Sequence, residues 1–189
     1  MAELSNDILL TCDDENRRGG IKRIFVINRE NVTSFTAGGT DHDYTAVTLD
    51  ATSDVWFEIQ IDDESGSMIA EGSRENGSSL QEHTVEALAP RIEKVKAKTL
   101  QDLFTSCKII VIVETYVSSG TYNKAFVVGY DELLGSDAAL RANITTTLEA
   151  ELQGQNAYTI SMTGKSGEIA REYVGDIETN SSGTVSFGS

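Results

Sequence analysis

Residues 107–130 read CKIIVIVETYVSSGTYNKAFVVGY, two apolar runs joined by a Ser/Gly turn. The first run, from Ile109 to Val113, contains only β-branched residues, which favour a strand over a helix. Both alternating faces of this run and of the return run, residues 124–130, are apolar, as is typical of strands covered on two sides. Gly120 permits a tight turn between them. The stretch therefore predicts a hairpin at the centre of the fold.

The rest of the chain also favours strands. Two-residue periodicity and turn-forming boundaries predict strands at 21–28, 55–61, 67–73, 79–89, 140–151, 157–163 and 169–174. Within 55–61, the alternation places Phe57 toward the core and both Trp56 and Glu58 on the opposite face. Residues 140–151 also have fair helix propensity, but the spacing of their apolar side chains and their threonine run favour a strand.

One helix is predicted at residues 99–106, TLQDLFTS, with Thr99 as its N-cap and an apolar stripe of leucines and Phe104. This helix should cover one face of the central hairpin. The basic segment before it, residues 91–98, is predicted to be extended or irregular. The sequence Gly164-Lys165-Ser166 resembles the end of a phosphate-binding loop, but the earlier glycine of that motif is replaced by Thr159 and no helix follows. A hairpin turn is predicted there instead.

Together these elements predict a mainly β fold, an antiparallel β-sandwich or partly closed barrel of about ten strands with one short flanking α-helix. The chain has 189 residues, of which 39% are hydrophobic. Residues 1–174 are accordingly predicted to form a single β-sandwich domain. Residues 175–189 read as a Gly/Ser-rich tail, with Val185 and Phe187 near its end. Because two apolar residues cannot order a Gly/Ser segment alone, both are predicted to contact a neighbouring subunit.

Charge and cysteine content exclude several classes of protein. Asp and Glu number 30 against 15 Lys and Arg, a net charge of −15, which repels phosphate backbones and anionic lipids. Cys12 and Cys107 are too sparse for a disulfide framework and are predicted to be free thiols. We expect a soluble protein made in a cytoplasm, since neither a signal peptide nor an apolar run long enough to span a bilayer is visible.

No set of residues predicts catalysis, a cofactor site or a metal site. Three acidic runs, residues 13–15, 41–43 and 62–64, could offer metal ligands, but neighbours on an extended chain point apart and a second histidine at ligand spacing is missing. Solvated turns are the favoured interpretation. Glu82 and His83 should face opposite sides of a strand and so form no dyad. We therefore expect no enzymatic activity.

The predicted strands 55–61 and 79–89 each carry acidic residues on one face, Glu58 on the first and Glu82 and Glu86 on the second. If the two strands are neighbours, the three carboxylates share one surface. The simplest interpretation is the solvated face of an antiparallel sheet. The more specific one is a wall that repels a polyanion.

The order of elements resembles that of phage tail tube proteins, virion proteins of tailed phages of Bacteroidota-type hosts. The resemblance rests on Cys12 with Gly19-Gly20-Ile21, TLQDLFTSCKIIVIVE at 99–114, NKAFVVGYDELL at 123–134 and GQNAYTISMTGKSGE at 154–168, and it covers residues 12–174. It implies a β-sandwich with a flanking helix that assembles into homo-oligomeric, hexameric rings. The rings stack into a tube in the virion and contact other tail or head–tail proteins. DNA would pass through without tight binding, and Glu58, Glu82 and Glu86 would face the lumen.

Two alternatives remain open at this point. The chain could be another virion ring protein of the same fold, such as a head–tail connector or a tail terminator. It could also be a monomeric β-sandwich binding module for carbohydrate or a host receptor. Such a module usually presents exposed aromatic side chains in a groove, and Trp56 is the only tryptophan.

Overall fold

A computed structural model describes residues 20–39, 42–61, 65–75, 78–90, 92–106, 108–119, 122–149 and 156–188. Its described part confirms the mainly β prediction, with stacked and mostly antiparallel sheets and one α-helix, α1 (Lys94–Thr105). The strands are β1 (Ile21–Asn28), β2 (Val32–Ala37), β3 (Asp43–Leu49), β4 (Phe57–Ile59), β5 (Ser67–Glu75), β6 (Ser78–Pro90), β7 (Ile109–Ser119), β8 (Tyr122–Val128), β9 (Arg141–Leu148), β10 (Asn156–Ser166), β11 (Arg171–Tyr173), β12 (Gly175–Thr179) and β13 (Gly183–Phe187). Two short 3-10 helices, η1 (Arg29–Asn31) and η2 (Ser136–Ala138), interrupt them.

The predicted central hairpin is confirmed as β7 and β8, in the middle of a seven-stranded sheet of order β2-β3-β11-β8-β7-β1-β4. Alternation along β7 sends Val111 to one core and Ile112 to a second core on the opposite face, and both side chains are fully buried. An unbroken β-branched run fits this position because each of its faces meets apolar neighbours.

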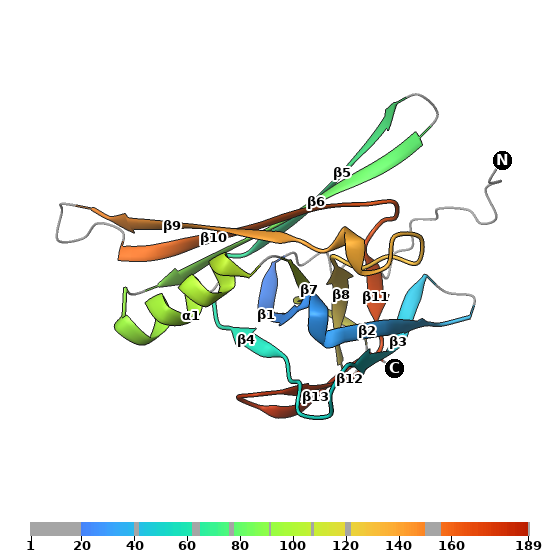
Figure 1. Ribbon diagram of the computed structural model, residues 1–189, viewed down its shortest axis with the longest axis horizontal. Coiled ribbons are helices and arrows are strands. Elements are labelled where there is room, and N and C mark those ends of the chain that lie inside the picture. The colour runs from blue at the N-terminus through green and yellow to red at the C-terminus, as the bar shows by residue number, and fades with distance from the viewer. Residues whose placement is uncertain are drawn as a thin grey trace.

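The first core lies between this sheet and a four-stranded sheet of order β5-β6-β10-β9 (Figure 1). Val85 on β6 pairs with Met162 on β10, and both contribute buried side chains to this core. Helix α1 adds Leu100 to the same core and lies against β9. The four-stranded sheet therefore has one buried face and one solvent-facing face.

The second core is rich in aromatic residues and is closed by the β12–β13 hairpin. Phe187 meets the edges of Phe25 and Tyr173, with ring centroids 5.7 and 6.0 Å apart. Trp56 lies fully buried in the same core. The Trp56 carbonyl accepts from the N–H of Asn180, and the Trp56 N–H donates to the carbonyl of Glu178. These two bonds anchor the hairpin to the residue just before β4.

This hairpin corrects the prediction for residues 175–189. The segment was expected to be a tail ordered by a neighbouring subunit, but over 175–188 it is ordered by the chain's own second core. Val185 and Phe187 are 8% and 2% exposed, so neither presents an apolar surface to another subunit. The premise was wrong because Ile177 on β12 and the facing sheet complete a cluster that two residues could not form alone.

Three local predictions also need correction. Helix α1 begins at Lys94, so residues 94–98 are helical rather than irregular, and Glu93 occupies the N-cap position predicted for Thr99. Residues 164–166 form the end of β10 rather than a turn. Glycine suits position 164 because a Cβ would lie 3.1 Å from the Ala138 carbonyl oxygen and 3.2 Å from the Leu140 Cα, closer than most Cβ contacts. The next strand, β11, pairs with β8 and β3 in the other sheet.

The predicted orientation within residues 55–61 is only partly right: Ile59 and Ile61 pack against the first core as predicted, but Trp56, predicted to face away from the core, is buried in the second core. Only Phe57–Ile59 form a strand, β4, which is an edge strand paired with β1 alone. Trp56 is fully buried whereas Phe57 is 49% exposed. The C-terminal hairpin is the physical reason, since it covers the side of the sheet on which Trp56 lies.

Candidate functional site

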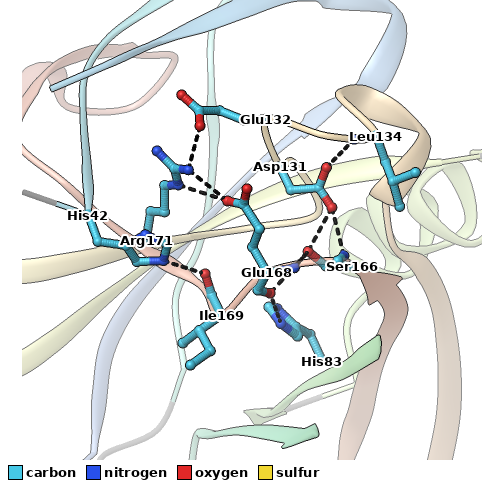
Figure 2. Close-up of polar contacts among 10 residues, drawn as sticks. His42, His83, Asp131, Glu132, Leu134, Ser166, Glu168, Ile169 and Arg171 are labelled. Carbon is cyan, nitrogen blue, oxygen red and sulfur yellow. Dashed lines mark hydrogen bonds and ion pairs between the residues drawn. The ribbon is translucent and has the colours of Figure 1, made fainter. Parts of the chain in front are cut away.

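A buried polar cluster lies where the end of β10 meets the loop after β8 and the middle of β6 (Figure 2). It contains His83, Asp131 and Ser166, whose exposed fractions are 2%, 1% and 3%. Buried polar side chains are costly unless they are hydrogen-bonded, so their contacts decide what this cluster can do.

The Asp131 carboxylate joins the loop to the end of β10. Its Oδ2 accepts from the Ser166 hydroxyl and from the backbone N–H of Gly167, both at 2.9 Å. Its Oδ1 accepts from the backbone N–H of Leu134 within its own turn. The carboxylate thus replaces the backbone pairing that β10 loses as it leaves the sheet.

His83 contacts the same segment through the backbone of Glu168. Its Nε2 lies 3.2 Å from the Glu168 carbonyl oxygen, and because a carbonyl only accepts, the bond assigns the proton to Nε2. Nδ1 is then an acceptor, and it is buried without a partner among the described residues. Burial lowers the pKa of His83, against the opposing effects of the Glu168 carbonyl and the Asp131 charge.

Serine, histidine and aspartate in one cluster suggest a catalytic triad, but the hydrogen bonds are arranged differently. In a triad, histidine bonds both to the nucleophile and to the acid. Here Ser166 bonds directly to Asp131 and to the Glu168 backbone, and His83 bonds to a carbonyl. The described contacts provide no histidine base for the serine hydroxyl. The geometry instead joins a loop to the end of a strand.

We expect the stability of the protein to fall as the pH drops below about 6.5, the ordinary pKa of His83. A lowered pKa in the fold means that the unfolded chain binds the proton first, so stability is full above 6.5 and is lost as the pH falls through the folded value. The slope from one proton is at most about 1.4 kcal/mol per pH unit. His83→Gln keeps a donor for the Glu168 carbonyl without titrating, so it should flatten this part of a urea-unfolding series.

The titration of Glu114 takes place at lower pH than that of His83 and can be separated from it. The pKa of Glu114 is also lowered, and its contribution is lost only below its ordinary value of 4.5. Identical slopes between pH 5 and 6.5 for the wild type and His83→Gln would show that His83 does not cause the acid sensitivity.

An ion cluster covers the outer side of this region. Arg171 donates to Glu168 from Nε at 2.9 Å and to Glu132 at 2.7 Å (Figure 2). Its guanidinium lies 5.1 Å from the centroid of the Tyr44 ring. Burial alone would lower the pKa of Arg171, but the two carboxylates outweigh it and raise the pKa. His42 bonds to the Ile169 carbonyl at 3.1 Å. These contacts fix the segment between β10 and β11 from outside.

A second buried carboxylate, Glu114 on β7, lies between its paired residues Arg23 on β1 and Ala125 on β8. Arg23, Asn123 and Lys22 donate to it at 2.5, 2.7 and 3.1 Å, and it is 3% exposed. Burial would raise the pKa of Glu114, but these hydrogen bonds outweigh burial and lower it. All of these partners are protein groups, so the arrangement is a closed ion cluster.

The structure separates the three acids predicted to share a surface. Glu82 and Glu86 lie on the solvent-facing side of β6, opposite the side that buries His83 and Val85. Glu58 lies on β4 in the other sheet and accepts from the hydroxyls of Ser181 and Ser182, each at 3.1 Å. The prediction of a common surface for all three is therefore wrong. It assumed that the two strands are neighbours, but β4 and β6 belong to different sheets.

Glu82 and Glu86 nevertheless belong to a wider acidic surface. Glu82 lies directly opposite Glu71 on β5, with Lys165 opposite it on β10. Like charges directly opposite each other on neighbouring strands are destabilising. We call this solvent-facing side of the four-stranded sheet, with Glu71, Glu82 and Glu86, the acidic face.

The other sequence-level candidates lie in several places. Among the described residues, no group of three or more His, Cys, Asp or Glu side chains could hold a metal ion. Residues 13–15 and 62–64, Asp41, and both cysteines lie outside the described ranges. Glu82 and His83 face opposite sides of β6, as predicted. No described helix combines the length and apolar character needed to cross a membrane.

Comparison with known proteins gives no relative for this chain. No protein family model, curated protein or solved structure was found to match it. The function must therefore be argued from the geometry.

Sequence reasoning missed Asp131 and Ser166 as functional candidates. Asp131 stands in a polar stretch after a strand, and Ser166 stands in a segment taken for a turn. Their separation of 35 residues gives no local signal. The one available hint was the placement of His83 on the apolar face of its strand, which requires a buried partner for a polar ring.

Proposed function

We propose that this protein is a self-assembling structural subunit of a phage tail, and specifically of the tail tube, whose stacked rings enclose a channel for DNA. The observation that carries the proposal is the four-stranded sheet. One side of it is core, the other is the acidic face, and among the described strands β5 and β9 are paired on one side only.

Open strand edges favour association with further strands. An exposed edge presents unpaired N–H and C=O groups, which proteins usually cover or pair. The sheet order β5-β6-β10-β9 places its two open edges on opposite margins. Pairing β5 of one copy with β9 of the next is a head-to-tail contact, and such contacts close into rings when the rotation between copies allows.

Both ends of this sheet extend beyond the body of the fold (Figure 1). The β5–β6 hairpin projects in one direction and the β9–β10 pair in the other, so each could reach a neighbouring copy. On β5, Ile69 is 50% exposed, and on β9, Leu148 is 73% exposed. Large apolar side chains at open edges are typical of surfaces that pack against a partner.

The acidic face gives such a ring its proposed chemistry. Joined edge to edge, the sheets would present Glu71, Glu82 and Glu86 from every copy on one continuous wall. Lys165 and Arg141 lie on the same face, but Glu71, Glu82 and Glu86 outnumber them, and a net negative wall repels the phosphate backbone, so DNA could pass without adhering. Mutual repulsion of the acids is tolerable in a wide aqueous channel, where salt screens charges over about 8–10 Å.

The structure weakens the binding-module alternative. Its main aromatic candidate, Trp56, is fully buried and cannot stack on a ligand. The exposed aromatic residues Phe57, Phe104 and Tyr116 lie on three different elements, β4, α1 and β7.

We expect the purified protein to form rings or tubes in negative-stain micrographs, and a proline substitution on β9 to abolish them. Alternate residues of a strand point their N–H groups to opposite sides, so Thr145→Pro and Thr146→Pro remove different donors. One variant should lose a bond to β10 and unfold more easily. The other should keep its unfolding midpoint and lose assembly.

The pair of variants serves as its own control, since both carry the same substitution on adjacent exposed positions. In a density map of the tube, Glu82 and Glu86 should line the channel. A strictly monomeric wild type at high concentration would rule out the tube. Assembly that survives in both proline variants would instead exclude β9 as the contact.

A further inference from the structure

A groove of about 320 Å³ lies between helix α1 and strand β9, on the inner side of the four-stranded sheet (Figure 1). Ala97, Leu100 and Phe104 line it from one face of the helix, at the spacing of neighbouring helical turns. Ile144 on β9 and Tyr158 on β10 line it from the sheet. Leu100 and Tyr158 also belong to the first core, so the groove is a continuation of that core toward solvent.

The groove lies along the open edge of β9. Among the described strands, β9 pairs with β10 alone. Leu148 lies on the same side of β9 as Ile144 and is 73% exposed, and Phe104 is 51% exposed. A strand added to such an edge gains backbone hydrogen bonds, and its alternate side chains enter the adjoining pocket. The geometry therefore favours an extended strand with apolar residues at every second position.

Charge around the groove favours an acidic strand. The sequence of α1 contains Lys94, Lys96 and Lys98 against a single acid, Asp102, although the whole chain has a net charge of −15. The β5–β6 hairpin, residues 67–90, contains four glutamates and one arginine. Opposite charges of this kind guide association and select among partners.

Strand β5 has the required pattern of side chains. Met68 and Ala70 lie on its inner side, opposite Val85 and His83 of β6. Ala70 is exposed and Met68 is only half-buried, and a methionine side chain adapts to irregular surfaces. In the proposed ring every copy turns the same side to the channel, so the inner sides of β5 and of the next copy's β9 coincide. Met68 and Ala70 then reach the groove.

Charge also disfavours pairing of like edges. Two β9 edges joined antiparallel would place both α1 helices on one side, with their lysines close together. Two β5 edges joined in the same way would place Glu71 of both copies on one face. Like charges on neighbouring strands are destabilising, so the pairing of β5 with β9 is the favoured one.

We propose that the groove between α1 and β9 receives strand β5 of a second copy, with Met68 and Ala70 packed against Phe104 and Leu148. This inference rests on the proposed ring, because it names the side-chain contacts that accompany the pairing of β5 with β9. It gives α1 two roles. Leu100 closes the first core, whereas Phe104 and the lysines select the partner strand.

The test places a photoreactive benzoylphenylalanine at position 104 of the full chain. Phe57 on β4 is 49% exposed and provides the matched control position. Chains labelled with ¹⁴N and ¹⁵N are mixed before assembly and irradiated, and mass spectrometry then distinguishes links within one chain from links between copies. We expect position 104 to link to residues 67–75 of another copy at least tenfold more often than position 57 does.

A second measurement needs no cross-linker. Phe104→Ala should raise the protein concentration for half-assembly at least tenfold and leave the urea-unfolding midpoint of the monomer unchanged, because the ring is half-exposed. Thr99→Ala, an exposed position on the opposite side of α1, should change that concentration by less than twofold.

The outcomes separate this inference from the tube itself. Links from position 104 to β9 of another copy would overturn it in favour of a symmetric contact, and links within one chain would overturn it in favour of an intramolecular occupant. Equal linking from positions 104 and 57, or assembly unaffected by Phe104→Ala, would remove the groove from the contact and leave the tube standing. A wild type that stays monomeric at high concentration would overturn both.

Discussion

Replacing Phe187 by alanine is expected to lower the free energy of unfolding by about 3–5 kcal/mol, the usual cost of truncating a buried aromatic side chain. The ring is 2% exposed and meets Phe25 and Tyr173 edge-on, so its removal leaves a cavity in the second core. Urea unfolding of the purified monomer, followed by tryptophan fluorescence, is well suited to the measurement. Trp56, the only tryptophan, lies in that same core.

Ser186→Ala is the matched control, since Ser186 is the exposed neighbour on the same strand. A surface change of this kind should stay within about 0.5 kcal/mol of the wild type. The pair distinguishes two roles for the C-terminal hairpin. A loss below about 1 kcal/mol for Phe187→Ala in the monomer would mean that the hairpin is held by another subunit rather than by its own chain.

An intramolecular role for the hairpin changes how the proposed assembly would be explained. If Val185 and Phe187 are core residues, removing residues 178–189 unfolds part of the chain instead of detaching a contact. The proposed association would then depend on surfaces that remain exposed after folding. The open edges β5 and β9 and their exposed Ile69 and Leu148 meet that condition.

Much of the strand content could be predicted from local patterns. The β-branched run of β7 and the alternating apolar residues of β10 predict directly which side chains are buried, because the period of two fixes which side chains share a face. Tyr158, Ile160 and Met162 are buried as this period requires. The same reasoning placed His83 beside Val85 on the inner side of β6 and Glu82 outside.

The pairing of strands that are distant in sequence could not be predicted in the same way. Residues 55–61 alternate cleanly, but which face is buried depends on what covers the sheet, and the C-terminal hairpin covers the face of Trp56. Glu58 was grouped with Glu82 on the assumption that successive strands pair. The chain instead places β4 beside β1 and β6 beside β10.

The C-terminal hairpin did carry a local signal. Ile177 on one side of Asn180-Ser181-Ser182-Gly183 and Val185 with Phe187 on the other alternate at a period of two, which is the pattern of two short strands around a turn. Gly183 has a φ of +68°, which suits the end of that turn. Glycine and serine content obscured this pattern, because composition averages over positions and alternation does not.

The buried polar cluster illustrates a different limit. Asp131 and Ser166 lie 35 residues apart, and neither position looks special alone. A carboxylate in a loop is ordinarily solvated, and only the fold shows that β10 ends against this particular loop. Long-range polar contacts therefore require the structure, because they are set by where strands end rather than by periodicity along them.

Replacing Asp131 by alanine is expected to cost roughly 2–5 kcal/mol of unfolding free energy. The backbone N–H groups of Leu134 and Gly167 would lose a charged acceptor in part-buried hydrogen bonds, and a hydrogen bond to a charged group contributes about 1.5–3 kcal/mol. Ser166 would suffer less, because its hydroxyl can turn to the Glu168 carbonyl at 3.1 Å. Urea unfolding of the variant at neutral pH gives the value.

Asp131→Asn tests the chemistry more narrowly at nearly constant volume. Asparagine has one side-chain oxygen, so it can accept on one side only and must turn its amide N–H₂ toward donors on the other. Its loss should therefore fall between those of the wild type and the alanine variant. Asp137→Ala, at a position whose side chain is 68% exposed and paired with Arg29, should cost less than about 1 kcal/mol. If Asp131→Ala unfolded no more easily than Asp137→Ala, the end of β10 would be held by its packing alone, and the polar cluster would have no structural role.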